Sequence, residues 1–232
     1  MEKHPHVRKR ARPHAPVSPW PHGGASTCPL VPMSPWGYRE GMKIAIVNSK
    51  GGVGKSTSSI YLGAALSRQG TVRVVDTDPQ GTATDWAERC IEAGTPLPFE
   101  VDVANVVTLK RLTETTDFTL IDTPPGDPTT IDAALRLADL VIVPSAPGVT
   151  DMARVWETLE ISSALAPSYV LFTAVDRRSR DLKDAKAALE REGAGYFDND
   201  IPFRKDVRNA LGRVPDRMFN YDQVAAEILE VI

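Results

Sequence analysis

Residues 49–57 have the composition of a phosphate-binding loop. The segment reads Ser-Lys-Gly-Gly-Val-Gly-Lys-Ser-Thr. Glycines let successive backbone N–H groups turn toward one anion, and Lys55 can reach the β- and γ-phosphates of a nucleotide. The Ser56 hydroxyl is a ligand for Mg²⁺, and Thr57 is placed to bond the α-phosphate. The residues predicted to contact ATP are Gly51, Gly52, Val53, Gly54, Lys55, Ser56 and Thr57.

This loop departs from the common pattern GxxxxGK[ST] at its start. The first glycine of that pattern would fall at position 49, where the chain has Ser49, and an additional lysine, Lys50, follows. A glycine-rich turn without a ligand is the alternative interpretation. It does not explain why two lysines lie so close together, because their repulsion needs an anion to offset it.

Three aspartates follow two short apolar runs downstream of this loop. Asp122 follows residues 118–121, while Asp76 and Asp78 follow residues 72–75. A carboxylate at the end of a strand beside the loop can hold a magnesium-bound water. The alternatives are a turn role for Asp122 and a helix-capping role for Asp76 or Asp78.

Three segments together resemble a known family. Lys50–Thr57 (KGGVGKST) resembles the deviant Walker A motif of the ParA/MinD superfamily of P-loop ATPases. Val75–Gly81 (VDTDPQG) resembles its second-strand motif, and Phe118–Gly126 (FTLIDTPPG) resembles its Walker B strand and the following loop. The motifs are in the family's order, and the resemblance covers residues 42–232.

The resemblance implies roles for these side chains in an ATPase that uses Mg²⁺. Lys50 would cross to the phosphates of a partner subunit in an ATP-bound homodimer, as an arginine finger does. Asp78 would orient the attacking water, and Asp76 would support the magnesium shell. The implied catalytic residues are Lys50, Lys55 and Asp78, and the implied metal residues are Ser56, Asp76 and Asp122.

The nucleobase site is expected late in the chain by the same resemblance. The matching segment is residues 201–204, which makes Pro202 and Phe203 candidates for contact with the base. Packing of Phe203 in the core is the alternative.

Family members of the ParA type bind DNA without sequence preference as ATP-bound dimers, and a ParB-like partner triggers hydrolysis. DNA binding of this kind needs lysines and arginines on one face. The candidates form two clusters: Arg177, Arg178, Arg180 and Lys183, then Arg204, Lys205 and Arg208, with Arg213 and Arg217 further on. A solvated surface balanced by neighbouring aspartates is the alternative. Because the formal net charge is −3, the DNA-binding interpretation depends on a local basic patch.

Other members of the superfamily provide rival functions. A MinD-like, membrane-associated ATPase that positions division machinery is expected to end in a basic amphipathic helix. Residues 222–232 contain Glu227 and Glu230 but no lysine or arginine, which is typical of a packing helix. A metal-cluster carrier would need bridging cysteines, and Cys90 is in the wrong place. A relative that positions a cargo other than a centromere remains open.

The elements that must position these residues alternate between strands and helices from Met42 onward. Such alternation predicts an α/β domain with a mostly parallel, twisted sheet covered by helices on both faces, the P-loop NTPase fold. The expected strands are residues 43–47, 72–75, 99–103 (at an edge), 118–121, 140–143, 169–172 and 195–198. The expected helices are residues 56–69, 80–92, 107–115, 129–137, 150–165, 180–192, 205–212 and 221–231.

Residues 1–41 differ from the rest of the chain. They are rich in proline, carry more basic than acidic residues and include every histidine of the sequence. Such a composition predicts a disordered tail, or upstream sequence before a true start at Met33 or Met42, and a tethering arm is the alternative. Without a histidine, residues 42–232 exclude histidine-based catalysis. No apolar run of membrane-spanning length is present, so we expect a cytoplasmic, nucleoid-associated protein.

Overall fold

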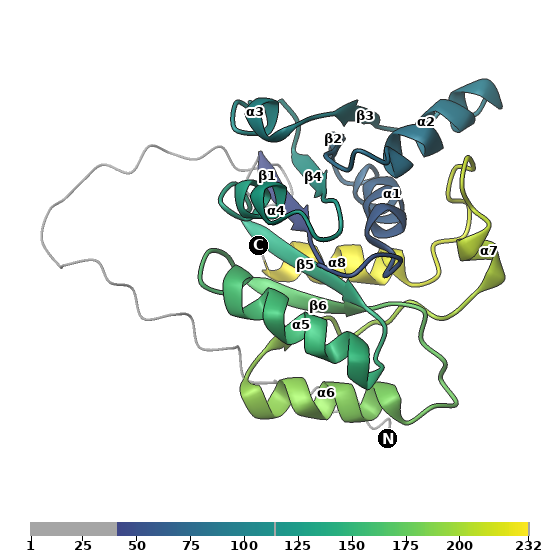
Figure 1. Cartoon of the computed structure of the whole chain (residues 1–232). Helices are drawn as coiled ribbons and strands as arrows, with labels where there is room; N and C mark the ends of the chain where they lie inside the picture. The colour runs from purple at the N-terminus through teal and green to yellow at the C-terminus, as the bar shows by residue number, and fades with distance from the viewer. Residues whose placement is uncertain (1–40, 114, 232) are drawn as a thin grey trace, which may run out of the picture.

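The structure is a computed structural model that describes residues 41–113 and 115–231. Apart from Gly41, the predicted N-terminal tail lies outside the described residues. A single seven-stranded sheet, in the order β3-β2-β4-β1-β5-β6-β7, organises this part of the chain (Figure 1). Each pair of neighbouring strands is parallel. The strands are β1 (Met42–Ile46), β2 (Val72–Asp76), β3 (Glu100–Val103), β4 (Phe118–Asp122), β5 (Leu140–Ser145), β6 (Ser168–Phe172) and β7 (Gly195–Tyr196).

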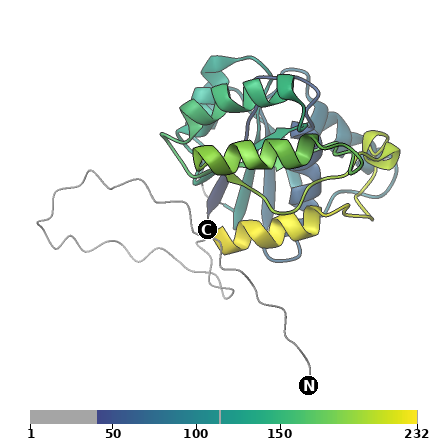
Figure 2. The same cartoon turned by 90° about the horizontal axis from the view of Figure 1, so that it is seen from below.

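Helices cover both faces of the sheet, as the alternating pattern predicts. The helices are α1 (Lys55–Leu66), α2 (Thr82–Glu92), α3 (Val106–Leu109), α4 (Pro128–Leu135), α5 (Val149–Ser162), α6 (Asp181–Glu192), α7 (Lys205–Arg208) and α8 (Tyr221–Val231). Buried residues of α1, α2 and α8 join one apolar cluster, and those of α3, α4, α5 and α6 join the other. Figure 2 shows α6 in green and α8 in yellow on opposite sides of the strands.

Strand β1 explains how one sheet can hold two cores. Successive side chains of a strand point to opposite faces. Ile44 and Ile46 belong to the cluster under α1 and α8, whereas Ala45 and Val47 belong to the cluster under α4 and α5. All four are fully buried, which accounts for the continuous apolar run in the sequence.

Two expected helices are shorter than the sequence pattern indicates. A capping box at Asn105 begins α3, but the helix ends after Leu109. Helix α7 ends at Arg208 because the chain then turns against α2. The Trp86 indole donates a hydrogen bond of 2.8 Å to the carbonyl oxygen of Arg213, and Gly212 has a positive φ of 76°. Long-range packing therefore overrides local helix propensity there.

The C-terminal helix α8 is a packing helix, as predicted. Its residues Val224, Ala225 and Ile228 are buried in the same core cluster as α1. Glu227 accepts hydrogen bonds from the backbone N–H groups of Asp198 and Asn199, at 2.6 and 3.0 Å. Across the described residues, no helix has the length and apolarity needed to cross a membrane.

The strand order determines where a ligand can bind. β1 lies between β4 and β5. The connection that leaves β1 runs through α1 on one face of the sheet toward β2, whereas the connection from β4 to β5 runs through α4 on the other face. In open parallel sheets, ligands bind at the carboxyl ends of the strands where the order reverses in this way. Residues 47–54, which connect β1 to α1, start at this position.

Candidate nucleotide- and metal-binding site

The loop between β1 and α1 has the backbone shape of an anion-binding turn. Gly52 and Gly54 have φ angles of 73° and 91°, a region that side chains with a Cβ rarely adopt. Gly54 precedes the first residue of α1, and no side chain caps that helix end. The N–H groups of the first helical turn are therefore available to an anion, and the helix dipole favours negative charge there.

Buried polar side chains hold this loop in place. The Asn48 amide donates to the carbonyl oxygen of Pro144 at 2.9 Å, and its oxygen accepts from the backbone N–H of Lys50 at 2.9 Å. The Thr173 hydroxyl, directly after β6, donates to the carbonyl oxygen of Val53 at 2.8 Å. The sequence reasoning missed Asn48 and Thr173. Polar residues directly after apolar strands were the available signal.

The Lys55 side chain lies inside the loop. It is 7% exposed, and its ammonium donates to the carbonyl oxygen of Lys50 at 3.1 Å. Burial lowers the pKa of Lys55 below its usual value, while the carboxylates of Asp122 and Asp78 act in the opposite direction. A buried ammonium with two carboxylates close by is suited to bind phosphate together with a metal ion.

Asp122 lies at the end of β4 with its carboxylate fully buried. Oδ1 accepts a hydrogen bond of 3.1 Å from the Ser59 hydroxyl, whereas Oδ2 is buried without a hydrogen-bond partner. Burial, reinforced by the nearby Asp76, raises the pKa of Asp122 to about 7, although bonds from Ser56 and Ser59 lower it. An unpartnered carboxylate oxygen beside the Ser56 hydroxyl fits a divalent cation.

The carboxylates of the other two aspartates, Asp76 and Asp78, accept hydrogen bonds from backbone N–H groups. Asp76 is 1% exposed, and its Oδ2 accepts from both the backbone N–H and the hydroxyl of Thr84, each at 2.9 Å. Its Oδ1 accepts from the backbone N–H of Asp78 at 3.0 Å. Asp78 in turn accepts from the backbone N–H of Gln80 at 2.9 Å. Both carboxylates lie beside the loop and support the start of α2, so a role in metal or water binding stays a prediction.

Two threonines that the sequence reasoning did not select join the strands at this edge. The Thr77 hydroxyl, after β2, donates to the carbonyl oxygen of Asp122 at 2.7 Å. The Thr123 hydroxyl, after β4, donates to the carbonyl oxygen of Ile46 at 2.8 Å. Both threonines are buried. They fix Asp76 and Asp122 relative to the loop, and their position directly beside a motif aspartate was the only signal.

Replacement of Asp122 by asparagine is expected to stabilise the nucleotide-free protein at pH 8. The raised pKa means that ionisation of Asp122 opposes folding, so its cost grows as pH rises from about 4 to about 7 and is then constant. A shift from 3.8 to about 7 corresponds to at most about 4 kcal/mol, and we expect a gain of about 2–4 kcal/mol. Urea unfolding at pH 4 and pH 8 measures it.

The matched control for this substitution is Asp132→Asn. Asp132 is exposed beside Arg136 on α4, and that contact lowers its pKa. Its replacement should give no stabilisation at pH 8. An Asp122→Asn protein that is less stable than the wild type at pH 8, and equally so at pH 4, would contradict the expected pH dependence.

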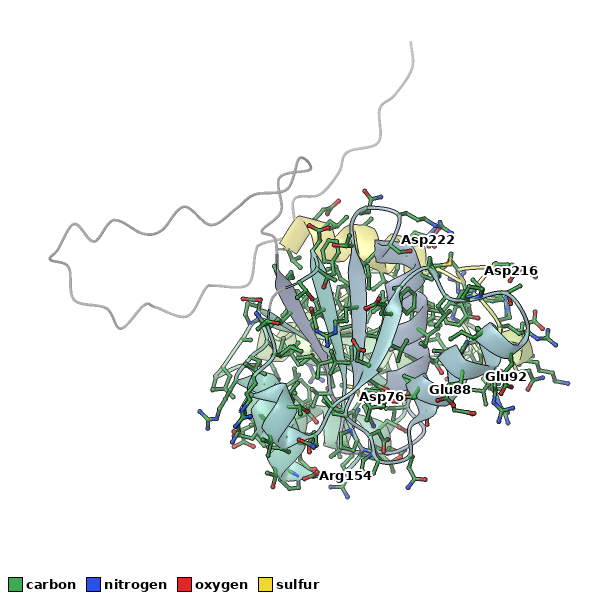
Figure 3. All side chains as sticks on the ribbon, turned by 90° about the horizontal axis from the view of Figure 1, so that it is seen from above. Asp76, Glu88, Glu92, Arg154, Asp216 and Asp222 are labelled. Atoms are coloured by element: carbon green, nitrogen blue, oxygen red, sulfur yellow. The ribbon has the colours of Figure 1, made fainter. Side chains whose placement is uncertain are left out.

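A hollow of about 560 Å³ opens beside the loop, on its outer side. Its lining residues are Ser49, Lys50, Gly126, Thr150 and Arg154. The Lys50 ammonium does not point at Lys55. It forms an ion pair of 2.6 Å with Asp151 in the first turn of α5. Figure 3 labels Arg154 on the same helix, toward the same end of the sheet as Asp76.

The expected nucleobase segment, residues 201–204, lies near the loop, and only its first residue, Ile201, is part of the core. Val175, which follows β6, pairs with Pro202 in an isolated parallel bridge, and Thr173, two residues earlier, contacts the loop. Phe203 is 47% exposed, and the Arg208 guanidinium lies over its ring at 6.0 Å. Core packing of Phe203 is therefore excluded, while contact of Pro202 or Phe203 with a base stays a prediction.

The same bridge brings the two basic clusters together. Phe203 donates its backbone N–H to the carbonyl oxygen of Val175 at 3.0 Å, so the segments carrying the clusters run side by side. Figure 1 shows α7 and the start of α6 on the same side of the molecule. All members are exposed: Arg177, Arg178, Arg180, Lys183, Arg204, Lys205 and Arg208.

Some basic side chains of these clusters are paired with carboxylates and others are not. Arg178 pairs with Asp176 at 3.0 Å, and Arg177 lies 3.8 Å from Asp200. Within the described part of the chain, the other members form no ion pair: Arg180, Lys183, Arg204, Lys205 and Arg208. Arg213 adjoins α2, whose exposed Glu88 and Glu92 lie with Asp216 on the right of Figure 3, and Arg217 follows Asp216 in the chain. Both arginines therefore have acidic side chains nearby.

Comparison with known proteins identifies relatives of this site and fold. The family model for the CobQ/CobB/MinD/ParA nucleotide binding domain matches residues 44–214. A maintenance of carboxysome distribution protein A from Gloeobacter kilaueensis is 37% identical over 164 residues, covering 67% of this chain and 74% of that protein. The chromosome-partitioning ATPase Soj of Thermus thermophilus is 33% identical over 211 residues, covering 72% and 83%.

A solved structure agrees with the fold. The plasmid partition protein of Borrelia burgdorferi B31, bound to AMPPNP, superposes with a TM-score of 0.68 at 21% sequence identity. The match covers 82% of this chain and 99% of that one. At this identity the likeness establishes the parallel-sheet fold, and it leaves the roles of individual residues to the geometry described above.

Proposed function

This chain belongs to the CobQ/CobB/MinD/ParA nucleotide-binding family, and on that premise we propose that it is a magnesium-dependent ATPase that moves or positions a cargo on DNA. In this proposal the ATP-bound form is a homodimer that binds DNA without sequence preference. Hydrolysis, stimulated by a ParB-like partner protein, returns it to a form that leaves the DNA. Such a protein would act in the cytoplasm, in association with the nucleoid.

One observation carries the ATPase part of the proposal. The buried Lys55 ammonium and the unpartnered Oδ2 of Asp122 lie in the same loop region, beside the uncapped start of α1. A cation, a metal-ligating carboxylate and a set of backbone N–H groups are what a nucleoside triphosphate with Mg²⁺ requires. The metal, when bound, supplies positive charge to the β- and γ-phosphate oxygens.

Residues of this chain bind the phosphates, hold the metal and orient the water in this proposal. Lys55 and the backbone of residues 51–57 bind and orient the phosphates. Ser56 and Asp122 would hold the metal, and Asp76, the last residue of β2, would support them. Asp78, which lies near the Lys55 ammonium, is the residue proposed to orient the attacking water. The Lys50 ammonium is proposed to contact the nucleotide of the second subunit.

The DNA-binding part rests on the joined basic clusters. Lysines and arginines bind backbone phosphates and release condensed counterions, so affinity comes from positive charge rather than from base contacts. Lys183, Lys205 and Arg208 are exposed and form no ion pair among the described residues. They offer such charge on one side of the molecule.

The cargo is the part that the chain itself does not specify. Of the relatives named above, one is named for the distribution of carboxysomes and another for the partitioning of chromosomes. We therefore propose an ATP-driven positioning cycle in which the partner protein determines the cargo. The membrane-associated alternative is not favoured, because α8 uses its apolar residues against α1.

DNA binding tests this proposal. Fluorescence anisotropy of a labelled random-sequence duplex, in 50 and 200 mM salt, should show binding with MgATP and little with MgADP or without nucleotide. We expect the double substitution Lys205→Ala, Arg208→Ala to weaken the ATP-dependent binding about 10–100-fold at low salt and to reduce its salt dependence.

The matched control for the DNA surface is Arg136→Ala. Arg136 is also an exposed arginine, but it lies on α4 and pairs with Asp132 there. Its loss should leave DNA binding within about twofold of the wild type, because it lies outside the clusters. Equal DNA binding with ATP, with ADP and without nucleotide would reject the cycle, and binding to anionic vesicles instead would favour the membrane-associated alternative.

A further inference from the structure

An exposed aromatic ring lies between the two basic clusters. Of the exposed large apolar side chains in the described part of the chain, only that of Phe203 is aromatic, and it is 47% exposed. Phe203 directly precedes the second cluster, and the bridge between Val175 and Pro202 brings the first cluster alongside. A single exposed apolar residue is ordinary on a protein surface. An aromatic ring among phosphate-binding cations is the combination that binds unpaired bases.

The backbone holds this ring in one place. Phe203 donates its N–H to the carbonyl oxygen of Val175 at 3.0 Å, and its own carbonyl oxygen accepts from the Arg204 guanidinium at 3.1 Å. Pro202, whose ring fixes its φ angle, comes directly before it and forms the bridge to Val175. Because the backbone already presents the ring, less conformational entropy is lost when a ligand stacks on it.

Cations are available at the ring and in both clusters. The Arg208 guanidinium lies over the ring, 6.0 Å from its centroid, which is at the outer limit of a cation–π contact. In the part of the chain that the structure describes, Lys183, Lys205 and Arg208 form no ion pair. The phosphates of a nucleic-acid strand can therefore contact these cations while one of its bases covers the ring.

The form of the DNA decides whether the ring can contribute to binding. In a duplex each base is paired and stacked between its neighbours, so a ring on the protein surface finds no free base face. Bases of a single strand can leave their neighbours, and each of them offers a π face whatever its identity. The cations alone attract both forms of DNA, whereas the exposed ring favours the single strand.

We propose that Phe203 and Arg208 form a stacking site for one unpaired base, so that the basic clusters bind single-stranded DNA as well as duplex DNA. The phosphates on either side of that base contact the lysines of the two clusters, Lys183 and Lys205. This inference rests on the proposed function, in which these clusters bind DNA, and it adds a class of DNA that the duplex-binding cycle does not require. An unpaired base is also present in the ATP of the same subunit, and the test separates the two sources.

The test compares oligothymidylate, which has no paired bases, with a random-sequence duplex of the same length. Fluorescence anisotropy is measured with the full chain and saturating MgATP, in 50 and 200 mM salt. We expect Phe203→Ala to weaken the binding of oligothymidylate about tenfold and to leave duplex binding within about twofold of the wild type. The loss should be similar at both salt concentrations, because stacking releases no counterions.

Three further variants show whether stacking is the cause. Phe203→Tyr keeps an aromatic face and should bind oligothymidylate like the wild type. Phe203→Leu keeps an apolar side chain without that face and should lose as much affinity as Phe203→Ala. Ile161→Ala is the matched control, because Ile161 is 58% exposed on α5, outside both clusters, and its loss should leave the binding of both DNAs within about twofold. Thermal unfolding checks that each variant is folded.

The outcomes separate this inference from the proposed function. If the wild type binds the duplex with MgATP but Phe203→Ala binds oligothymidylate as tightly as the wild type does, the stacking site is wrong although the proposed function stands. Equal weakening of both DNAs by Phe203→Ala would also contradict the stacking site. If Phe203→Ala instead weakens MgATP binding about tenfold in titration calorimetry, the ring contacts the base of the nucleotide and the inference is wrong. If the wild type binds neither DNA with MgATP, the inference and the proposed function are both wrong.

Discussion

Replacement of Lys55 by alanine is expected to abolish binding of MgATP at micromolar protein concentration. The substitution removes the one buried ammonium inside the loop among the described residues and leaves the carboxylates of Asp122 and Asp78 without it. Charge-assisted hydrogen bonds to phosphate in a shielded site contribute several kcal/mol in total, so we expect a loss of about 100-fold or more in affinity. Titration calorimetry with ATP and Mg²⁺ measures it.

Two controls make this result specific. Lys186→Ala removes a half-buried lysine of α6 whose ammonium donates to the carbonyl oxygen of Asp198, and this variant should bind MgATP like the wild type. Thermal unfolding should show that Lys55→Ala is folded, since loss of a buried ammonium relieves a desolvation cost. A Lys55→Ala protein that binds MgATP within about threefold of the wild type would contradict the loop as the phosphate site.

Replacement of Lys50 by alanine is expected to have a different effect, because this ammonium faces the outer hollow. The monomer should still bind MgATP, but ATP-dependent dimerisation should be lost. Hydrolysis at protein concentrations where the wild type is dimeric should fall by about 1000-fold or more, the range seen when a cation is supplied across an interface to a transferring phosphate. Sedimentation with AMPPNP and steady-state release of inorganic phosphate measure the two effects.

The different effects expected of Lys55→Ala and Lys50→Ala test the proposed site most directly. Binding lost in Lys55→Ala and kept in Lys50→Ala supports one cation for the subunit's own nucleotide and another for its partner's. A Lys50→Ala protein that forms the same ATP-dependent dimer as the wild type would reject the role of Lys50 across the interface. In that case the ion pair with Asp151 would be a local stabilising contact only.

The sequence was sufficient for the features that depend on local pattern. Apolar runs that end in glycine or aspartate predicted β1, β2 and β4 and the loop at their carboxyl ends, and the structure brings these ends together. Strands buried on both faces lack alternation, so their continuous apolar composition was the informative signal. The same pattern placed Lys55 and Asp122 in one site before any distance was known.

Contacts between residues distant in sequence could not be predicted in this way. Thr173 and Val53 are 120 positions apart, and no composition or periodicity connects them. The pair of Lys50 with Asp151 is similar, because an aspartate in the first turn of a helix is ordinary for helix stability alone. The length of α7 was also wrong in the prediction, since packing against Trp86 decides where that helix ends.

The segment after β6 contacts both the phosphate-binding loop and the segment that carries the second basic cluster. Thr173 is bonded to the loop through the carbonyl oxygen of Val53, and Val175, two residues later, is paired with Pro202 between the basic clusters. Residues 173–175 therefore connect the loop to the basic clusters. If the chain binds nucleotide and DNA as proposed, we expect a displacement of the loop by phosphate to reach the basic clusters through these three residues.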